Sequence, residues 1–203
     1  MDIFCIHLPH RTDRMNNIKS LQKKYPSFNF IVVNGILDEN GARGCLLSHQ
    51  SIIRMAKQQN LPYVWVIEDD CQFLVNNGTL LTHARNMINF MRDTSVEIVN
   101  GCGNINDPRI QIKGNSDTLT FLKSECVSTT HCIVYNASSY DKLLAFGSDT
   151  IADVNTNACN MLFTYPYLAT QLPCYSDIEK KDVVYDNIMK SMNHVRSIVQ
   201  GGH

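Results

Sequence analysis

Three consecutive acidic residues at the end of an apolar run are the part of this chain best suited to chemistry. Residues 63–67 read Tyr-Val-Trp-Val-Ile, which predicts a short buried strand, and Glu68, Asp69 and Asp70 follow directly. Carboxylates in that position repel one another and resist burial, so they need a compensating cation. Because side chains alternate along a strand, Glu68 and Asp70 are expected on one side and Asp69 on the other.

A pair of carboxylates at the carboxyl end of an α/β strand suits a hard divalent cation that also holds phosphate groups. The motif therefore predicts a metal–diphosphate site built on Glu68 and Asp70. A solvated acidic loop after a strand is the simpler alternative, since Asp is common in turns.

A second charged group follows the predicted first strand, residues 2–8. Arg11 and Arg14 could bind a diphosphate through their guanidinium groups, and the start of the next helix could add its dipole. A surface helix start, with Asp13 as cap and ion-pair partner, fits the same spacing equally well.

Three further positions could contribute to a site. Ser48 and His49 are polar residues inside a predicted helix, which favours a cleft-facing position, although a single His is more often satisfied in the core or at the surface. Asp153 opens another predicted helix, where it is either an N-cap, the commoner role, or a catalytic base. Residues 166–171 and 176–178 are polar and aromatic, but their spacing indicates no mechanism.

Strands and helices are predicted to alternate along the chain. The predicted strands are 2–8, 28–33, 63–68, 96–100, 130–135 and 167–171. The predicted helices are 11–24, 45–59, 80–91, one capped by Ser138 or Ser139 and ending at 146, 153–162, and an amphipathic one near the C-terminus. Residues 104–118 are expected to form a long loop.

This alternation predicts an α/β fold with a mixed, largely parallel sheet flanked by helices. Ligands gather beyond the carboxyl ends of the strands in such sheets. The first three strands end at His7, residues 34–35 and residues 68–70, so these residues are expected on one edge.

The composition bounds the class of protein. With 203 residues the chain is expected to form a single domain over residues 1–199, and its net charge of -1 argues against nucleic acid as a partner. The eight cysteines are scattered without a Cys-x-x-Cys pair, and no signal sequence or membrane span is evident, so a cytoplasmic location is expected. The oligomeric state is not readable from the sequence.

Taken in order, several segments resemble glycosyltransferase family 25, the lipopolysaccharide and procollagen glycosyltransferase type. The family shows a turn with two arginines after the first strand, a Gly-x-x-Gly-Cys-x-x-Ser-His helix start and a strand that ends in Glu-Asp-Asp. His7 stands where the family usually has Asn, and the short chain fits a viral or minimal cytosolic member, or the first domain of a longer protein. The matching segments are residues 7–14, 41–49, 67–70, 129–135, Asp153, 165–171 and 176–178.

The resemblance implies the GT-A fold and a nucleotide-sugar donor, most simply a UDP-sugar, bound with Mn²⁺ or Mg²⁺. It implies that Asp70 binds the cation and that Glu68 reaches the cation or the ribose. The other residues that it places at the donor are His7, Leu8 and Gly35 at base and ribose, Arg11 and Arg14 at the diphosphate, and Asp69, Ser48, His49 and His131 near the donor or metal.

Members of the family mostly invert the anomeric centre, which requires a carboxylate to deprotonate a hydroxyl of the glycan, lipid or protein acceptor. Asp153 is the first candidate for this base and Asp177 the second. Two alternatives remain open at this point. One is a sugar-nucleotide nucleotidyltransferase, although residues 9–11 lack the glycines of its usual loop. The other is a non-catalytic nucleotide-sugar-binding domain.

Overall fold

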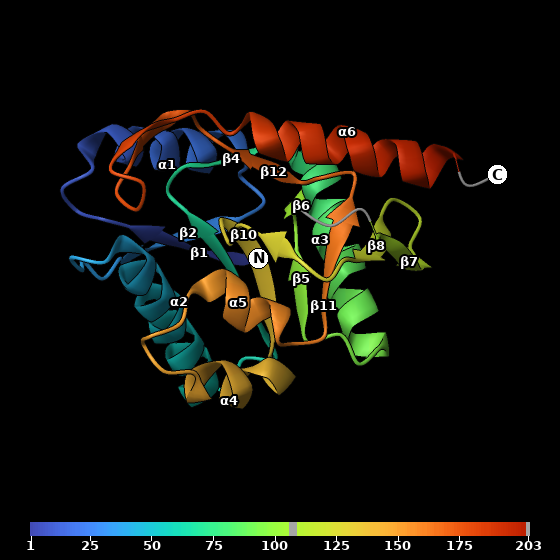
Figure 1. Ribbon diagram of the computed structural model, residues 1–203, viewed down its shortest axis with the longest axis horizontal. Coiled ribbons are helices and arrows are strands. Elements are labelled where there is room, and N and C mark those ends of the chain that lie inside the picture. The colour runs from blue at the N-terminus through green and yellow to red at the C-terminus, as the bar shows by residue number, and fades with distance from the viewer. Residues whose placement is uncertain (106–108, 202–203) are drawn as a thin grey trace.

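The computed structural model describes residues 1–105 and 109–201, and its centre is an eight-stranded sheet. The strand order is β2-β1-β3-β10-β5-β11-β8-β7 (Figure 1). The strands are β1 (Asp2–His7), β2 (Asn29–Asn34), β3 (Tyr63–Glu68), β5 (Ile98–Asn100), β7 (Gln111–Asn115), β8 (Thr120–Lys123), β10 (Cys132–Asn136) and β11 (Met161–Tyr165).

The sheet is mixed, and its parallel part carries the predicted site. β1 pairs in parallel with β2 and β3, whereas β10 lies antiparallel between β3 and β5. β11 is parallel to β5, and β8 and β7 complete the far edge as antiparallel strands. The predicted mixed α/β sheet flanked by helices is confirmed.

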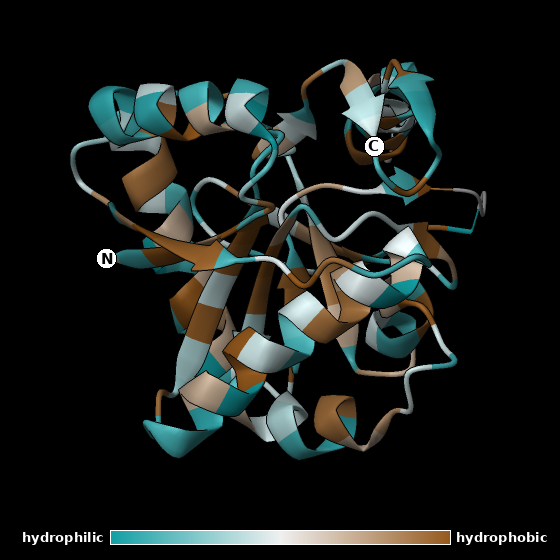
Figure 2. Cartoon of the chain, turned by 90° about the vertical axis from the view of Figure 1, so that its left-hand side faces the viewer, coloured by the Kyte–Doolittle hydropathy of each residue, from teal (hydrophilic) through white to brown (hydrophobic). Residues whose placement is uncertain are grey.

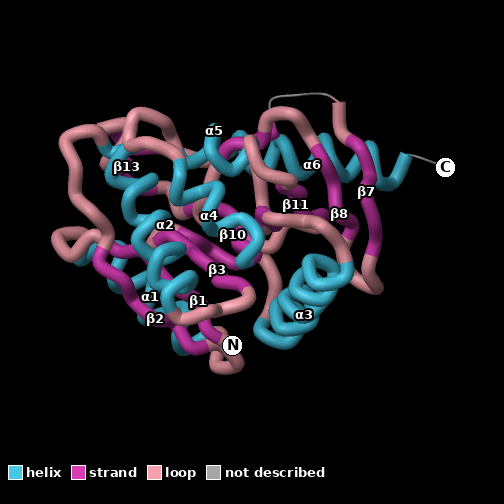
Figure 3. The backbone as a smooth tube through the Cα atoms, turned by 90° about the horizontal axis from the view of Figure 1, so that it is seen from below, coloured by secondary structure: helices cyan, strands magenta, loops and turns pink. Residues whose placement is uncertain are grey.

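Helices cover both faces of the sheet. α2 (Gly41–Gln58), α4 (Ala137–Ala145) and α5 (Ala152–Asn157) lie on one side of the strands, and α3 (Asn77–Asp93) lies on the other (Figure 3). α1 (Thr12–Lys24) contacts β1 and β2, and α6 (Asp186–Gly201) contacts β11. Asparagine side chains begin three of these helices, because Asn40, Asn76 and Asn136 accept backbone N–H groups of the first turns of α2, α3 and α4.

The central strands form the apolar core. Apolar residues concentrate on them, whereas the helices carry mixed faces (Figure 2). Trp65 on β3 is buried and makes edge-to-face contacts with Phe28 and Phe73, and Phe73 in turn packs against Tyr25. This packing fixes β3, and therefore the carboxylates at its end, against the rest of the sheet.

Three short strand pairs lie outside the main sheet. β4 (Cys71–Phe73) pairs with β12 (Ala169–Gln171), and β13 (Cys174–Ser176) forms a hairpin with β14 (Lys181–Val183). β6 (Asn104–Ile105) pairs with β9 (Val127–Ser128). The first pair brings residues 169–171 beside the chain that leaves β3, although these segments are about a hundred residues apart in the sequence.

Three expectations about the elements are wrong. The helix expected to be capped by Ser138 or Ser139 has Asn136 as its cap, and both serines lie within α4. The helix predicted over 153–162 ends at Asn157, and Leu162 lies in β11, because a short apolar run does not distinguish a buried strand from a helix. The loop expected over 104–118 contains β6 and β7, while residues 106–108 lie outside the described part of the chain. Across residues 1–105 and 109–201, no helix combines the length and hydropathy needed to cross a membrane.

Candidate active site

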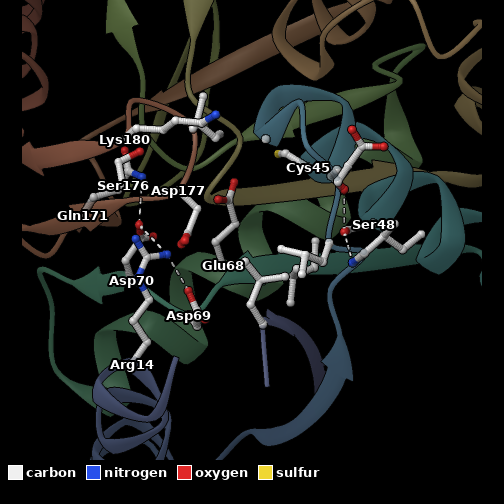
Figure 4. A pocket seen from close by; sticks show the side chains of 18 of the residues that line it. Arg14, Cys45, Ser48, Glu68, Asp69, Asp70, Gln171, Ser176, Asp177 and Lys180 are labelled. Atoms are coloured by element: carbon white, nitrogen blue, oxygen red, sulfur yellow. Dashed lines mark hydrogen bonds and ion pairs between the residues drawn. The ribbon is translucent and has the colours of Figure 1, made fainter. Parts of the chain in front are cut away.

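The carboxyl ends of β1, β2 and β3 meet at one edge of the sheet, as predicted. In register, His7 lies opposite Asn34 and Ile6 lies opposite Glu68. A cavity of about 310 Å³ opens at this edge, between the strand ends, the start of α2 and residues 171–185 (Figure 4). Its polar wall includes Arg14, Glu68, Asp69, Asp70, Gln171 and Asp177.

The three carboxylates all line this cavity, which corrects the predicted alternation. β3 ends at Glu68, and residues 69–70 form a turn, so the strand's alternation no longer orients Asp69 and Asp70. Both aspartates instead face Arg14, whose Nη1 lies 2.8 Å from Asp69 Oδ1 and 3.4 Å from Asp70 Oδ2. Glu68 lies between this group and Cys45 and Ser48 on α2 (Figure 4).

Asp69 is the fully paired member of the three. Its second carboxylate oxygen lies 2.8 Å from Nδ1 of His7, and its side chain is almost completely buried. Asn17 on α1 donates hydrogen bonds to the backbone carbonyls of Asp69 and Cys71, which hold the turn in place. Asp69 therefore fixes the turn after β3 against His7 of β1 and Arg14 of α1.

Asp70 is buried without comparable compensation. Its Oδ2 accepts a 3.3 Å hydrogen bond from Gln171, but its Oδ1 has no hydrogen-bond partner among the described residues. Burial, followed by the charges of Glu68 and Asp69, raises the pKa of Asp70 to about 7, although Arg14 acts in the opposite direction. A buried, unpaired carboxylate oxygen beside other carboxylates is the arrangement that a bound cation would stabilise.

Glu68 has a different environment. Its Oε1 accepts a 3.1 Å hydrogen bond from Thr130 and lies 3.7 Å from Nε2 of His49. Burial raises the pKa of Glu68, but the nearby His49, with smaller contributions from His131 and Thr130, makes the net direction downward. Glu68 is therefore held as a carboxylate at the centre of the site.

The two arginines differ in their access to the cavity. Arg14 lines it, and Asp70 and Asp69 raise its pKa against the effect of burial. Arg11 is buried behind it and binds both oxygens of Asp13, the backbone carbonyl of Tyr175 and, at 2.5 Å, Oδ2 of Asp177. Arg11 thus connects the β13–β14 hairpin to the start of α1. Arg11 is not part of the cavity wall.

Of the three residues predicted to contact the base and ribose, Leu8 lines the cavity, whereas His7 and Gly35 do not. Ile6 and Ile36 line it as well. His7 holds Asp69 from behind, and Gly35 packs against Ile6 and Leu8, where an added Cβ would lie 3.2 Å from either side chain.

The start of α2 packs so closely against the backbone of Ile36 and Asp177 that glycine is required at two positions. A Cβ on Gly44 would lie 2.6 Å from the carbonyl oxygen of Ile36, and one on Gly41 would lie 2.9 Å from that of Asp177. Ser48 stabilises the same approach, since its hydroxyl donates to the Gly44 carbonyl at 2.7 Å and accepts the Ile36 N–H at 2.8 Å. The Gly-x-x-Gly-Cys-x-x-Ser-His segment therefore has a clear structural role in closing one wall.

A second cavity of about 320 Å³ adjoins the first and shares Cys45, Glu68, Gln171 and Tyr185 with it. Asp153 lies in its wall, and its carboxylate accepts the N–H of Thr129 at 3.0 Å. The N-cap of α5 is Ile151, so Asp153 is not the helix cap. Burial, followed by the charge of Glu68, raises the pKa of Asp153 to about 6.

Thr129 itself has φ 87°, in the left-handed region that β-branched residues rarely adopt. Backbone strain of this kind tends to be kept where a site requires a fixed geometry. Here it directs the Thr129 N–H at the Asp153 carboxylate.

His131 and Asp177 are placed less favourably for the roles suggested for them. His131 is fully buried, its Nε2 lies 3.1 Å from Sγ of Cys102, and burial lowers its pKa to about 4, so the ring is neutral. Asp177 lines the first cavity, but Arg11 holds its carboxylate. Asp153 is thus the better placed of the two candidate bases.

Several residues of the site had no role assigned from the sequence, although Gln171 and Ser176 lie in segments that resemble the family. Gln171, Ser176, Lys180 and Tyr185 line the first cavity, and Tyr135 supports His49 from behind. Residues 171–185 reach the site through the β4–β12 and β13–β14 strand pairs. The sequence did not predict these pairs.

The sequence model of glycosyltransferase family 25, described as an LPS biosynthesis protein, matches residues 16–102. This region runs from α1 through β5 and contains the start of α2 and the three carboxylates. Residues 16–102 are thus similar to this family, and the match covers less than half of the chain. The predicted resemblance and the predicted enzyme class, a glycosyltransferase, are confirmed, with sugar transfer as the general activity.

Solved structures are similar in fold. The crystal structure of A197 from STIV covers 91% of this chain and 93% of its own, with 10% identity and a TM-score of 0.50. A glycosyltransferase involved in the glycosylation of the major capsid of PBCV-1 covers 70% of this chain and 62% of its own, with 13% identity and a TM-score of 0.42. At these identities the likeness concerns the fold alone. No curated protein matches the chain in sequence.

Proposed function

We propose that the chain transfers a hexosyl group from a nucleotide sugar, a UDP-sugar in the first instance, to a hydroxyl acceptor with inversion and with a divalent cation bound. The observation that carries this proposal is the buried Oδ1 of Asp70, at the wall of a cavity at the carboxyl ends of β1–β3, for which the described part of the chain offers no hydrogen-bond partner. The family 25 region supports the sugar-transfer chemistry.

The residues present fit a hard cation such as Mn²⁺ or Mg²⁺. Asp70 would hold it through the unpaired oxygen, and Glu68, which is kept ionised, would be the second carboxylate. When bound, such a cation neutralises charge on the two phosphates as the nucleoside diphosphate leaves.

The first cavity suits the donor. Ile6, Leu8 and Ile36 provide an apolar surface at the ends of β1 and β2 for the base and ribose. Arg14 and Lys180 also line the cavity and supply positive charge for the phosphates. Arg14 is already oriented by Asp69, so it requires little rearrangement to interact with a phosphate oxygen.

The second cavity suits the acceptor, because it contains Asp153 and opens onto Glu68 from the other side. The Asp153 carboxylate would accept the proton of the acceptor hydroxyl. The acceptor oxygen then forms its bond to the anomeric carbon as the bond from that carbon to the diphosphate oxygen breaks, and the electron pair leaves with the nucleoside diphosphate. A carboxylate with a pKa of about 6 is ionised at neutral pH and is a stronger base than a free aspartate.

The extent of the proposed catalytic domain follows from the same residues. The two cavities draw on side chains from Ile6 to Tyr185, so residues 1–199 would act as one domain. The hydroxyl lining of the second cavity, from Ser128, Thr129 and Thr130, is suited to a polar acceptor such as a glycan.

Calorimetric titration tests the proposal directly. UDP-glucose, UDP-galactose and a GDP-sugar are each titrated into the protein, once with Mn²⁺ and once with a chelator. We expect one donor to bind only with Mn²⁺, and Asp70→Asn to weaken that binding at least tenfold. Asp141→Asn, which changes an exposed aspartate on α4, should leave it unchanged.

Absence of binding by every donor, in folded protein with Mn²⁺ present, would contradict the proposal. Release of pyrophosphate from a nucleoside triphosphate and a sugar 1-phosphate would instead identify a nucleotidyltransferase.

A further inference from the structure

A second group of potential metal ligands lies beside the carboxylates, on the α2 side of Glu68. Cys45 and His49 are one helical turn apart on α2, so their side chains project from the same face of the helix. Sγ of Cys45, a ring nitrogen of His49 and a carboxylate oxygen of Glu68 all lie within 4.8 Å of one another. Cys45 and Glu68 line both cavities, so an ion could reach this group from either side.

His49 gives the independent sign that this group is built for a ligand. Its side chain is 2% exposed, and its buried Nε2 has no hydrogen-bond partner among the described residues. Its Nδ1 lies 2.9 Å from the hydroxyl of Tyr135. If Nδ1–H donates to the tyrosine oxygen, the lone pair of Nε2 points toward Glu68, and a fixed tautomer of this kind is typical of metal-binding histidines.

The separations and atom types agree with a particular class of cation. Nε2 of His49 and Oε1 of Glu68 are 3.7 Å apart, close to the separation of about 3.4 Å expected for two tetrahedral ligands at about 2.0–2.1 Å from zinc. A thiol, an imidazole and one carboxylate favour Zn²⁺ or Co²⁺, whereas Mg²⁺ and Mn²⁺ favour oxygen ligands. The group therefore differs in selectivity from the carboxylates around Asp70.

We propose that Cys45, His49 and Glu68 form a second metal site, selective for a borderline divalent cation such as Zn²⁺ or Co²⁺. Because Cys45 and Glu68 line both cavities, an ion held there would remain accessible to water. Because Glu68 belongs to both groups, an ion held by Cys45 and His49 withdraws this carboxylate from the donor-binding cation. Zn²⁺ bound at this site should therefore inhibit transfer. The inhibition rests on the proposed function, whereas the binding of the ion does not.

Titration with Co²⁺ alone, in the absence of donor, tests the binding. Cobalt bound to a cysteine thiolate absorbs in the near ultraviolet through charge transfer and in the visible through ligand-field bands. We expect both features in the unaltered protein, at one equivalent, and expect Zn²⁺ to abolish them by displacement. Asp70→Asn should retain them, because Asp70 is outside this ligand set.

Matched cysteine variants show which thiol is responsible. Cys45→Ser should lose the charge-transfer band, whereas Cys126→Ser, which alters an exposed cysteine elsewhere, should keep it. His49→Gln should weaken cobalt binding at least tenfold. Circular dichroism and thermal unfolding of each variant verify that the fold is intact.

Two results would overturn the proposal: no thiolate–cobalt band in the unaltered protein, or an equal band in folded Cys45→Ser. The outcome is separable from that of the proposed function. A cobalt band in protein that binds no nucleotide sugar would reject the transferase proposal alone, and donor binding without a cobalt band would reject this one alone.

Discussion

Two groups of carboxylates lie within the same site and differ in how their charge is compensated. Asp69 and Asp177 are each held by a guanidinium group, Asp69 by Arg14 and Asp177 by Arg11. Asp70 is buried and Asp153 is half-buried, both with weaker compensation, and burial raises their pKa values to about 7 and about 6. The paired carboxylates fix the loops of the site, whereas the under-compensated ones retain the capacity to bind a cation or accept a proton.

This contrast has a physical basis. A paired carboxylate gains stability from the fold, but its oxygens are already occupied. An unpaired one costs stability, and a fold keeps such a group only where something else makes use of it. The proposed function predicts that this difference separates residues that hold the site from residues that act in it, and three experiments can break or sharpen that distinction.

The largest expected effect is on turnover in Asp153→Asn. An amide cannot accept the acceptor's proton, so the rate of transfer should fall by about 10²–10⁴-fold, the typical contribution of a general base. Donor affinity should be unchanged, because Asp153 lies in the second cavity. Measurement of kcat in parallel with calorimetric donor binding would show this separation. The exposed Asp141→Asn is the control for each measurement.

A rate within tenfold of the unaltered enzyme would exclude Asp153 as the base. Asp177 would then become the candidate, and its pairing with Arg11 would have to be broken in the presence of substrate. That outcome would also weaken the distinction between paired and under-compensated carboxylates.

The sequence predicted the parallel part of the fold and the edge at which the site lies. Apolar β-branched runs at residues 2–8, 28–33 and 63–68 define β1, β2 and β3, whose register brings His7, Asn34 and Glu68 to one edge. β1 and β3 are largely buried and β2 is the half-exposed edge strand, but each is a short apolar run that its own residues reveal. Membership of the site was therefore predictable for Glu68, Asp69 and Asp70.

The pairing of those residues was not predictable. Whether Arg11 or Arg14 enters the cavity depends on the β13–β14 hairpin, which brings Asp177 to Arg11 from about 166 positions along the chain. Residues 171–185 supply Gln171 and Tyr185 through short strand pairs that have no periodic pattern. Long-range contacts of this kind leave no mark in local spacing, so one sequence does not reveal which carboxylate is compensated.

A comparison of two adjacent aspartates tests the contrast as a statement about stability. Asp69→Asn removes the partner of Arg14 and His7 and leaves a buried guanidinium group undercompensated, so the free energy of unfolding should fall by about 2–4 kcal/mol. Asp70→Asn removes a charge that burial disfavours, so the free energy of unfolding should be unchanged or higher. Urea denaturation of both variants at pH 7.5, without metal, measures the difference.

Equal destabilisation by the two substitutions would contradict the distinction. Arg92→Ala is a useful reference, because it removes an exposed ion pair with Asp93 and should change the free energy of unfolding by less than about 1 kcal/mol.

The smallest expected effect is a pH-dependent gain in stability in Asp153→Asn. The raised pKa means that the folded state binds the Asp153 proton more tightly than the unfolded state does. The stability from this group is therefore fully present below the unfolded pKa, near about 4, and is lost as the pH rises through about 6. Asp153→Asn carries no such proton, so it should be more stable than the unaltered protein by about 1–2 kcal/mol at pH 7.5 and not at pH 4. Urea denaturation at a series of pH values measures this, and a difference that stays constant with pH would show that Asp153 is not an under-compensated carboxylate.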